Sequence, residues 1–465
     1  MRATFPFPGG PLSRLLLSTA ASFLIALGCT PDSESATLEV YSWWDSSGEK
    51  AAFNALVGPF ERSRPDIDVR NGYRRDSQEV RGDLGALMLQ GVPPNTFQAN
   101  AGADLLQWAA VDFAPAADGP FDGSLPSPQD SWNLLTDVSG LLGREALDAL
   151  YPEVRRQVCV EASNAEHHLA VPVNIHRLNL LYYNTDRVAD AERRFAMDSL
   201  CPENAAELAP SERPAFDLAI SVGDGLSLTL LTFENLLLAV GKETAYRALL
   251  EGGDPSLWRA PMQRALGCLW YLSGAFIEAD DWDLAVQAVV SADADLVVMG
   301  DWASAEIPEA DRAAIGRRPF PGTEEYFVYA SDTFPRPKNI THSEHTEALL
   351  RSFGQFETQL RFSRFKGSIP ALRRAEPPDG LDAWARESWS AFQDPARTKV
   401  LATSGWFPRA FPQRRLADGL EQVVEAETLE DFQRLAQQVL DLLEGSLPIF
   451  RAWQDRFQPC NEAAR

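Results

Sequence analysis

Short apolar runs alternate with longer segments of helical periodicity along most of the chain. Runs of alternating or continuous apolar residues predict strands at 38–44, 68–73, 96–100, 168–173, 178–184, 216–222, 294–299 and 326–330. Apolar residues three and four positions apart predict helices at 49–63, 79–91, 228–240, 255–274, 282–291, 345–361, 381–392 and 416–443. The Pro-, Gly-, Ser- and Asp-rich segment 114–131 predicts a surface loop, and segment 190–214, rich in Ala, Glu and Pro, predicts an irregular connection. This alternation is typical of an α/β protein.

The first 28 residues have the pattern of a secretory signal peptide. Arg2 and Arg14 precede or flank an apolar run at 15–27, which is shorter than the roughly 20 residues that a membrane-spanning helix needs. The sequence Ala-Leu-Gly-Cys at 26–29 resembles a bacterial lipobox, in which Cys29 is acylated after cleavage; the alternative is an ordinary secretory peptide with a chance cysteine. The polar segment that follows predicts a short tether, which gives residues 29–37 as a lipid-anchored linker. No later segment is apolar enough to span a membrane.

Charge and cysteine content limit the possible partners. The formal net charge is −24, so the surface repels nucleic acid and anionic lipid, and we expect no nucleic-acid partner. An exported chain with Cys159, Cys201, Cys268 and Cys460 can form one or two disulfides, with three connectivities if all four pair. The spacing of the cysteines and of the five histidines lacks the close pairs of a zinc site, so no metal is predicted.

Two adjacent indoles stand where the first predicted strand gives way to a helix. Neighbouring strand residues point to opposite faces, so Trp43 and Trp44 cannot both lie flat on one ligand, and we expect one in the core and the other exposed. Ligands of open α/β sheets bind at the carboxyl ends of strands, and an indole face suits the apolar face of a pyranose. The alternative for this segment is that both rings are simply buried.

Four more predicted strand or helix ends carry polar groups suited to sugar hydroxyls. Amide, imidazole and charged side chains that could converge there are Gln98 and Asn100, Asn174, His176 and Arg177, Asp301 beside Trp302, and Lys366. Each hydroxyl donates and accepts hydrogen bonds, so convergent amides and single charges bind it well. Taken alone, each residue is more typical of a cap or a satisfied structural group. Together they predict a cleft for a polar small molecule.

Several motifs, in order along the chain, resemble those of the sugar-binding subunits of bacterial ABC importers. They are Ser-Trp-Trp at 42–44, Gly-Val-Pro-Pro-Asn-Thr-Phe-Gln at 91–98, Val-Pro-Val-Asn-Ile-His-Arg at 171–177, Met-Gly-Asp-Trp-Ala at 299–303, Asp-Thr-Phe at 332–334 and Lys-Gly-Ser-Ile at 366–369. The chain is similar to the maltose-binding-protein-like class, and most to its glucose-binding branch. The resemblance implies a type II periplasmic-binding-protein fold, an α/β fold of two lobes with a mixed sheet in each, flanked by helices, and a ligand cleft between them.

The resemblance also implies lobe boundaries and ligand contacts. Residues 38–140 and 292–365 are expected in the N-terminal lobe, and residues 141–291 and 366–465 in the C-terminal lobe. Ligand contact is expected from Trp43, Trp44, Gln98, Asp301 and Lys366. Asn174, His176 and Arg177 are expected to line the cleft or the hinge between the lobes, and Asn100 and Trp302 are also predicted to bind the ligand.

The sequence departs from the glucose-binding pattern in the second lobe. The segment at 198–216 lacks the usual Pro-x-Thr-Trp-Asp-x-Phe pattern, and Leu226 stands where relatives have a tryptophan. A late His-Gly pair is replaced by Ser404-Gly405-Trp406, in which Trp406 is a candidate substitute contact. The motifs of the first-lobe half of the site are thus kept and those of the second-lobe half are altered. The preferred ligand is therefore not fixed as glucose.

We therefore expect a non-enzymatic, monomeric receptor that is lipid-anchored in the periplasm and has no cofactor. Its expected partners are a monosaccharide and the transmembrane subunits of an ABC permease. One alternative is an orphan receptor of this fold for envelope sensing or protein interaction. The other is a glycoside hydrolase, which needs two carboxylates about 5–9.5 Å apart. Asp45, Asp224, Asp301 and Asp332 offer no pairing with a defensible spacing, and no Gly-x-Ser-x-Gly nucleophile motif occurs.

Overall fold

Five sheets and the helices around them make up the described part of the chain. The computed structural model describes residues 36–72, 77–109, 134–162, 165–208, 214–221, 228–403, 413–456 and 460. The predicted signal peptide, Cys29, the loop at 114–131, Leu226 and Trp406 lie outside the described residues. Within the described part, no helix combines the length and the apolar character that crossing a membrane requires.

The first sheet is parallel and has the strand order β2-β1-β3. Its strands are β1 (Ala36–Tyr41), β2 (Ile67–Asn71) and β3 (Thr96–Phe97). Ala36, Leu38 and Val40 alternate toward the core along β1, as the period of a strand requires. Helices α1 (Ser47–Ser63) and α2 (Ser77–Gln90) connect the parallel strands. Helix α1 begins at a capping box, in which Ser46 accepts from the Glu49 N–H and Glu49 accepts from the Ser46 N–H.

A second group of strands lies beside the first sheet and gathers around β16 (Asp332–Pro337). Its partners are β4 (Ala99–Asn100), β5 (Leu135–Thr136) and β8 (Ala170–Pro172), all antiparallel to it. The helices of this half are α3 (Ala103–Ala109), α4 (Ser139–Ala149), α5 (Pro152–Gln157), α11 (Ser343–Phe353) and α12 (Phe356–Lys366). We call these two sheets with their helices the first lobe.

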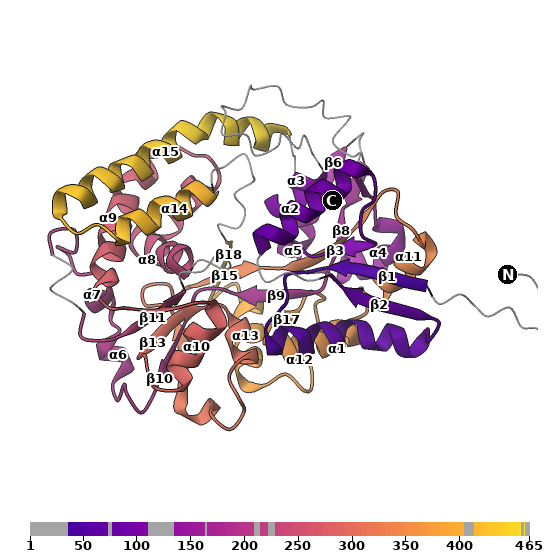
Figure 1. The fold of residues 1–465 in the computed structure, drawn as a ribbon, viewed down its shortest axis with the longest axis horizontal. Helices are drawn as coiled ribbons and strands as arrows, with labels where there is room; N and C mark the ends of the chain where they lie inside the picture. Colours follow the sequence, from indigo (N-terminus) through magenta and orange to yellow (C-terminus); the bar gives the residue numbers. More distant parts are fainter. Residues whose placement is uncertain are drawn as a thin grey trace, which may run out of the picture. The chain divides into compact units, whose positions relative to one another are not determined.

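The second lobe is built on a mixed five-stranded sheet of order β12-β11-β13-β10-β14. Its strands are β10 (Leu180–Asn184), β11 (Leu218–Ser221), β12 (Phe276–Ala279), β13 (Leu296–Met299) and β14 (Ile315–Pro319). The helices are α6 (Ala191–Arg194), α7 (Met197–Leu200), α8 (Leu228–Leu250), α9 (Pro255–Ser273), α10 (Trp282–Val290), α14 (Gln413–Val424) and α15 (Leu429–Arg456). Helices α8, α9, α14 and α15 gather on one side of this sheet and α10 on the other (Figure 1). The sheet is therefore buried on both faces, which explains its continuous apolar strands.

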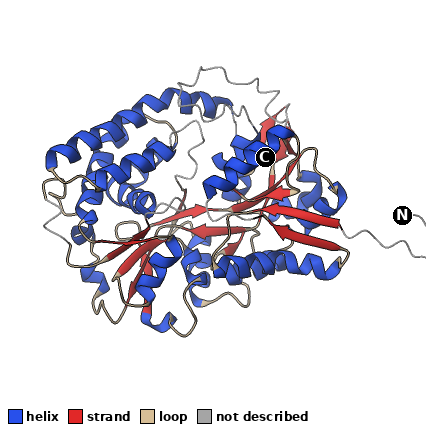
Figure 2. Cartoon of the chain, in the orientation of Figure 1, coloured by secondary structure: helices blue, strands red, loops and turns tan. Residues whose placement is uncertain are grey.

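A four-stranded sheet, of order β17-β9-β15-β18, links the two lobes. Its strands are β9 (Asn174–Arg177), β15 (Tyr326–Ala330), β17 (Ile369–Pro370) and β18 (Lys399–Ala402), with α13 (Ala383–Gln393) nearby. The chain passes from β9 directly into β10 of the second lobe, and from β15 directly into β16 of the first. Figure 2 shows the strands flanked by helices throughout. The predicted two-lobe α/β fold with mixed sheets is confirmed.

Strand pairing suggests a different lobe division from the one expected from sequence. Residues 292–365 were assigned to the N-terminal lobe, yet β13 and β14 pair with β10 and β11 in the second-lobe sheet. Only from β16 onward does this segment pair with the first lobe. Residues 141–291 were assigned to the C-terminal lobe, yet β8, which lies within them, pairs with β16 of the first lobe. We propose that the chain returns to the first lobe near Ser331, because the hydrogen-bonded sheets define the units that can move together.

Two disulfides select one of the three possible connectivities. Cys159 pairs with Cys460, and Cys201 pairs with Cys268. The first joins positions 301 residues apart in sequence and the second joins positions 67 apart. Cys159 lies in the hairpin of β6 (Cys159–Ala162) and β7 (Ala165–His168). Both bonds restrict the unfolded chain and thereby stabilise the folded one.

Candidate functional site

The structure brings three of the predicted site residues, Gln98, Asn174 and His176, to one buried carboxylate, that of Asp332. Gln98 Nε2 donates to Asp332 Oδ1 at 2.8 Å, and Asn174 Nδ2 donates to Asp332 Oδ2 at 2.9 Å. In return, the backbone N–H of Asp332 donates to Asn174 Oδ1 at 2.8 Å. Gln98 follows β3, Asn174 opens β9 and Asp332 opens β16. The strand ends therefore converge as expected from sequence, with Asp332 at their centre.

His176 lies between two carboxylates that come from different lobes. Its Nδ1 is 2.5 Å from Asp301 Oδ1, and its Nε2 is 3.2 Å from Asp332 Oδ2. Asp301 follows β13 of the second lobe, and its other oxygen accepts from the Arg177 N–H at 2.9 Å. His176 on β9 thus connects the end of a second-lobe strand to the start of a first-lobe strand.

The charges in this cluster determine its protonation. Burial by itself lowers the pKa of His176, but the adjacent carboxylates of Asp301 and Asp332 outweigh burial and raise that pKa to about 9. Burial raises the pKa of Asp332, but its hydrogen bond to His176 and the imidazolium charge outweigh this, so the pKa of Asp332 is lowered. At neutral pH, His176 is therefore an imidazolium between two carboxylates.

This cluster predicts a pH dependence of stability. Because the pKa of His176 is raised from 6.5 to about 9, its contribution is complete below about pH 6.5 and is lost as the pH rises through 9. We expect the free energy of unfolding to fall by on the order of 2–3 kcal/mol over that interval. The lowered pKa of Asp332 works in the opposite direction, since its contribution is lost as the pH falls below its ordinary value of 3.8.

Urea unfolding between pH 5 and pH 10 measures this effect. The variant His176→Gln should be less stable at pH 6 and should show a flatter profile between pH 6.5 and 9. A wild-type profile that is equally flat in this interval would show that His176 is neutral in the folded protein.

One of the two indoles lies in the core, as expected, whereas the other is half-buried rather than exposed. Trp44 is 1% exposed and its ring packs against Phe53, Phe334 and Phe362. Trp43 is half-buried, and its backbone N–H donates to Gln98 Oε1 at 3.3 Å. The backbone link to Gln98 places Trp43 next to the Asp332 cluster. Trp44 thus belongs to the first-lobe core, which argues against its predicted ligand contact, and Trp43 is the remaining candidate indole.

Lys366 lies near the cluster, in a buried ion pair with Glu49. The Lys366 Nζ is 2.5 Å from Glu49 Oε1 and 5.5 Å from the centroid of the Trp44 ring. The chain can pass close to Asp301 beyond Lys366 because Gly367 has a left-handed φ of 76° and no Cβ; a Cβ there would collide with Ser304 Oγ and the Asp301 carbonyl. The glycine of the Lys-Gly-Ser-Ile motif therefore allows Lys366 to approach the Asp301 turn.

A further contact joins the lobes at the start of α1. Ser46 Oγ donates to Glu306 Oε1 at 2.7 Å, and the Gly48 N–H donates to the same oxygen at 3.0 Å. Glu306 ends the short 3₁₀ segment Asp301–Ala305 of the second lobe, so its carboxylate is held at the positive end of a first-lobe helix. Burial raises the pKa of Glu306. These contacts hold the two lobes together at the edge of the cluster.

The other predicted residues take different positions. Trp302 is half-buried, with its ring edge-on to His176 at 5.1 Å between centroids. Asn100 pairs with Asp332 through the β4–β16 backbone ladder. Arg177 is buried, its guanidinium 5.0 Å from the centroid of the Phe327 ring. Trp406 and the predicted lipidation site Cys29 lie outside the described residues.

Three residues of this site were absent from the predicted set, namely Asp332, Glu49 and Glu306. Asp332 stood in the Asp-Thr-Phe motif, but as one of several scattered acids. Glu49 could have been found as the fourth residue of the Ser-x-x-Glu capping box, which points to the helix terminus next to Trp44. Glu306 had no local signal, because only the tertiary fold brings it to Ser46.

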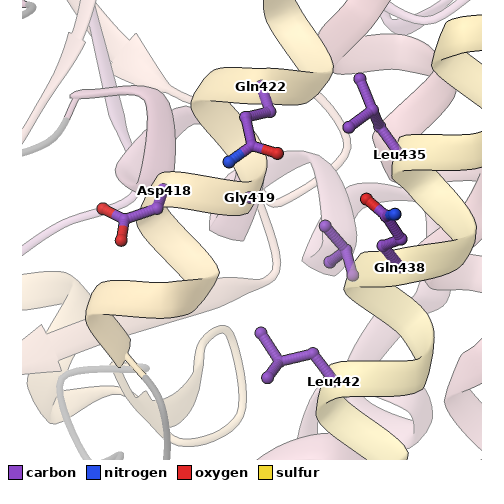
Figure 3. Close-up of a pocket in the computed structure, with 7 residues that line it drawn as sticks. Asp418, Gly419, Gln422, Leu435, Gln438 and Leu442 are labelled. Carbon is purple, nitrogen blue, oxygen red and sulfur yellow. The ribbon is translucent and has the colours of Figure 1, made fainter. Parts of the chain in front are cut away.

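A separate surface hollow lies between α14 and α15, far along the chain from these motifs. Its volume is about 300 Å³, and Figure 3 shows the side chains that face it. The described residues that line it are Asp418, Gly419, Gln422, Leu435, Gln438, Val439 and Leu442. None of these lining residues belongs to the predicted ligand set.

Known proteins resemble the chain along most of its length, although no protein-family model matches it. An uncharacterised ABC transporter extracellular-binding protein of Pyrococcus horikoshii is 27% identical, over 94% of this chain and 96% of the relative. A probable sugar-binding periplasmic protein of Mesorhizobium japonicum is 26% identical, over 79% of this chain and 83% of that protein. The structure of the bacterial solute receptor AcbH superposes with a TM-score of 0.65 at 16% identity, over 90% of this chain and all of the receptor.

The chain has the fold of ABC-transporter solute-binding proteins. The sequence relatives support the broader expectation from its motifs, an extracellular binding protein of the maltose-binding-protein-like class. These relatives are binding proteins, which favours binding over catalysis for the buried carboxylates described above. The narrower likeness to the glucose-binding branch stays a prediction.

Proposed function

We propose that this protein is the sugar-binding receptor of an ABC importer, and that it binds a monosaccharide between its lobes and delivers it to a permease. The observation that carries the proposal is the convergence of Gln98, Asn174 and Asp301, with Trp43 beside them, at the junction of the two lobes. Amides, a carboxylate and an indole face together provide the hydrogen bonds and the apolar surface that a pyranose needs. The Mesorhizobium relative is described as sugar-binding, and AcbH as preferring β-D-galactopyranose.

The contacts across the lobe junction suggest how binding is coupled to closure. His176 bonds to a carboxylate from each lobe, and Glu306 of the second lobe bonds to the start of α1 in the first. A ligand that touches both lobes shifts the equilibrium toward the closed state only by its preference for that state. The permease would then recognise the closed, loaded form. In this proposal the mature protein is a monomer anchored in the periplasm through acylated Cys29.

The hydrolase alternative fits this geometry less well. Asp301 and Asp332 are 0% and 4% exposed, and one protonated imidazole bridges them. A hydrolase needs one protonated carboxylic acid and one carboxylate flanking the scissile bond. Since the pKa of Asp332 is lowered, it is a poor general acid near neutral pH. The Asp301–His176–Asp332 cluster is therefore better suited to stabilising the lobe junction or binding a ligand than to acid–base catalysis.

Isothermal titration of the chain from Thr30 onward tests the proposal, with glucose, galactose, mannose, xylose and several disaccharides as ligands. We expect one monosaccharide to bind with a Kd of about 1 μM or lower, that is about −8 kcal/mol. Binding only of disaccharides would support a sugar receptor but contradict its proposed specificity for a monosaccharide. No binding across the panel would favour an orphan receptor of this fold, a result that the altered second-lobe motifs would then explain.

A further inference from the structure

The hairpin of β6 and β7 holds a cluster of potential metal ligands, none of which belongs to the candidate site described above. In its antiparallel register Cys159 lies opposite His168, and Glu161 opposite Glu166. Directly opposed residues share a face of the ladder, as do residues two positions apart on one strand. One ligand atom each of Cys159, Glu166 and His168 lie within 4.8 Å of one another. This cluster of three residues is called the hairpin triad below.

His168 presents an unused nitrogen. Its side chain is 2% exposed, and its Nδ1 is 3.0 Å from Ser139 Oγ. Ser139 Oγ donates its own hydrogen to Asp137 Oδ1 at 2.6 Å, so it accepts from His168 Nδ1–H. This leaves Nε2 as the nitrogen with a lone pair, and among the residues that the structure describes that buried atom has no hydrogen-bond partner. A buried polar atom without a partner is costly unless something else satisfies it.

The hydrogen bonds behind His168 resemble those that orient metal-bound histidines. A histidine ligand normally donates its second N–H to a carboxylate, carbonyl or water, which fixes the ring and its tautomer. Here Asp137 acts through Ser139 on Nδ1. The N–H on Nδ1 leaves Nε2 with the lone pair, which is the arrangement of a neutral imidazole. A neutral imidazole is the form that binds a metal.

Two features oppose metal binding while the protein is oxidised. Cys159 is bonded to Cys460, and a disulfide sulfur is a poor ligand compared with a thiolate. Glu166 is paired with Arg155, with 3.0 Å between Oε2 and the guanidinium Nη2. Arg155 also contacts Asp148 at 3.4 Å and therefore retains an acidic partner if Glu166 turns to a metal. The disulfide is the decisive obstacle.

We propose that reduction of the Cys159–Cys460 disulfide opens a zinc site formed by the hairpin triad. A dithiol reductant supplies two electrons and two protons, which cleave the S–S bond into two thiols while the dithiol becomes a disulfide. Zn²⁺ then displaces the proton of the Cys159 thiol and binds the thiolate, the Glu166 carboxylate and His168 Nε2, with water as the fourth ligand. In the oxidised protein the disulfide therefore links the hairpin to Cys460. In the reduced protein the zinc ion would instead link the two strands of the hairpin. Sequence spacing conceals the site, because Cys159 and His168 are nine positions apart and only the hairpin pairs them.

The variant Cys460→Ser tests the site without any reductant, since it frees Cys159 and leaves Cys201–Cys268 intact. Metal-free protein is titrated with Zn²⁺ against a chromophoric chelator, and with Co²⁺ to detect the thiolate-to-cobalt absorption band. We expect one Zn²⁺ per chain and the cobalt band in Cys460→Ser, and binding at least about tenfold weaker in the oxidised wild type. Wild type treated with dithiothreitol and then freed of it should match the variant.

Histidine variants in the Cys460→Ser background decide which side chain binds. His168→Ala should weaken Zn²⁺ binding at least about tenfold and shift the cobalt spectrum. The matched control is His167→Ala, which removes the adjacent, more exposed imidazole that contacts Asp137, and it should leave binding unchanged. Circular dichroism shows that each variant is folded. Equal affinities in all these proteins, or no zinc binding by either Cys460→Ser or the reduced wild type, would overturn the proposal.

Discussion

Replacing Trp44 with alanine is expected to lower the free energy of unfolding by about 3–5 kcal/mol, because it empties an aromatic core position. The ring is 1% exposed and packs against Phe53, Phe334 and Phe362. Trp43→Ala should cost only about 1–2 kcal/mol, since that side chain is half-buried. Urea unfolding of the two variants without ligand measures the difference.

The same pair of variants separates ligand stacking from folding. Trp43→Ala should abolish the fluorescence quenching caused by the sugar that the titration identifies, and weaken its binding. Trp44→Phe, which keeps an aromatic ring in the core, should bind that sugar with nearly unchanged affinity. If Trp43→Ala binds as tightly as wild type while Trp44→Phe does not, then the buried ring contacts the ligand and our assignment of the two indoles is reversed.

Strong local patterns made many elements predictable from sequence. Alternation at Leu38 and Val40 identified β1, and three- and four-residue spacing identified α1, to within a few residues of the structure. The strand β9 was missed, although the motif that contains it was recognised. Its residues Asn174–Arg177 are all buried, but three of the four are polar, so no apolar pattern marks them. They are buried because tertiary hydrogen bonds satisfy them, and a local pattern cannot show those bonds.

Helix ends were less predictable than helix faces. The helix predicted at 345–361 is two helices, α11 and α12, because Gly354 ends the first and Gln355 adopts an extended conformation before the second. The helix predicted at 416–443 is likewise divided into α14 and α15. There Thr428 Oγ1 accepts from the Asp431 N–H, which is a recognisable helix start in the sequence. Amphipathic periodicity continues across such breaks when both helices cover the same core.

In the candidate site, too, local motifs identified single residues, whereas the partners of those residues depend on the tertiary fold. Strand ends placed Gln98, Asn174 and Asp301 correctly as neighbours in space, and the family motifs added Lys366. The sequence did not reveal that Asp332 would be the common acceptor for Gln98 and Asn174, or that Lys366 would pair with Glu49. Those partners lie 158 to 317 positions away along the chain, so only the assembled sheets define them.

Asp301→Ala should lower the free energy of unfolding by about 3–5 kcal/mol at pH 7, because it removes a buried carboxylate from the His176 imidazolium. It also leaves the buried Arg177 N–H without the acceptor that it has now at 2.9 Å. The double variant His176→Ala/Asp301→Ala should recover part of the loss, since the unpaired charge is then gone too. Urea unfolding of the two single variants and the double variant gives the coupling energy. A coupling near zero would mean that the pair does not carry charge.

Asp301 is also a predicted sugar contact, so its effect on binding must be separated from its effect on folding. Asp295 provides the matched control, because it is a buried carboxylate just before the same strand, β13, paired with Arg187 and Arg194. Asp295→Ala should destabilise the protein yet leave sugar affinity unchanged. Asp301→Ala should weaken binding by about 1.5–3 kcal/mol, measured on folded protein by titration. If both variants bind equally well, Asp301 only holds His176 in place, and the ligand must be recognised by the amides and Trp43.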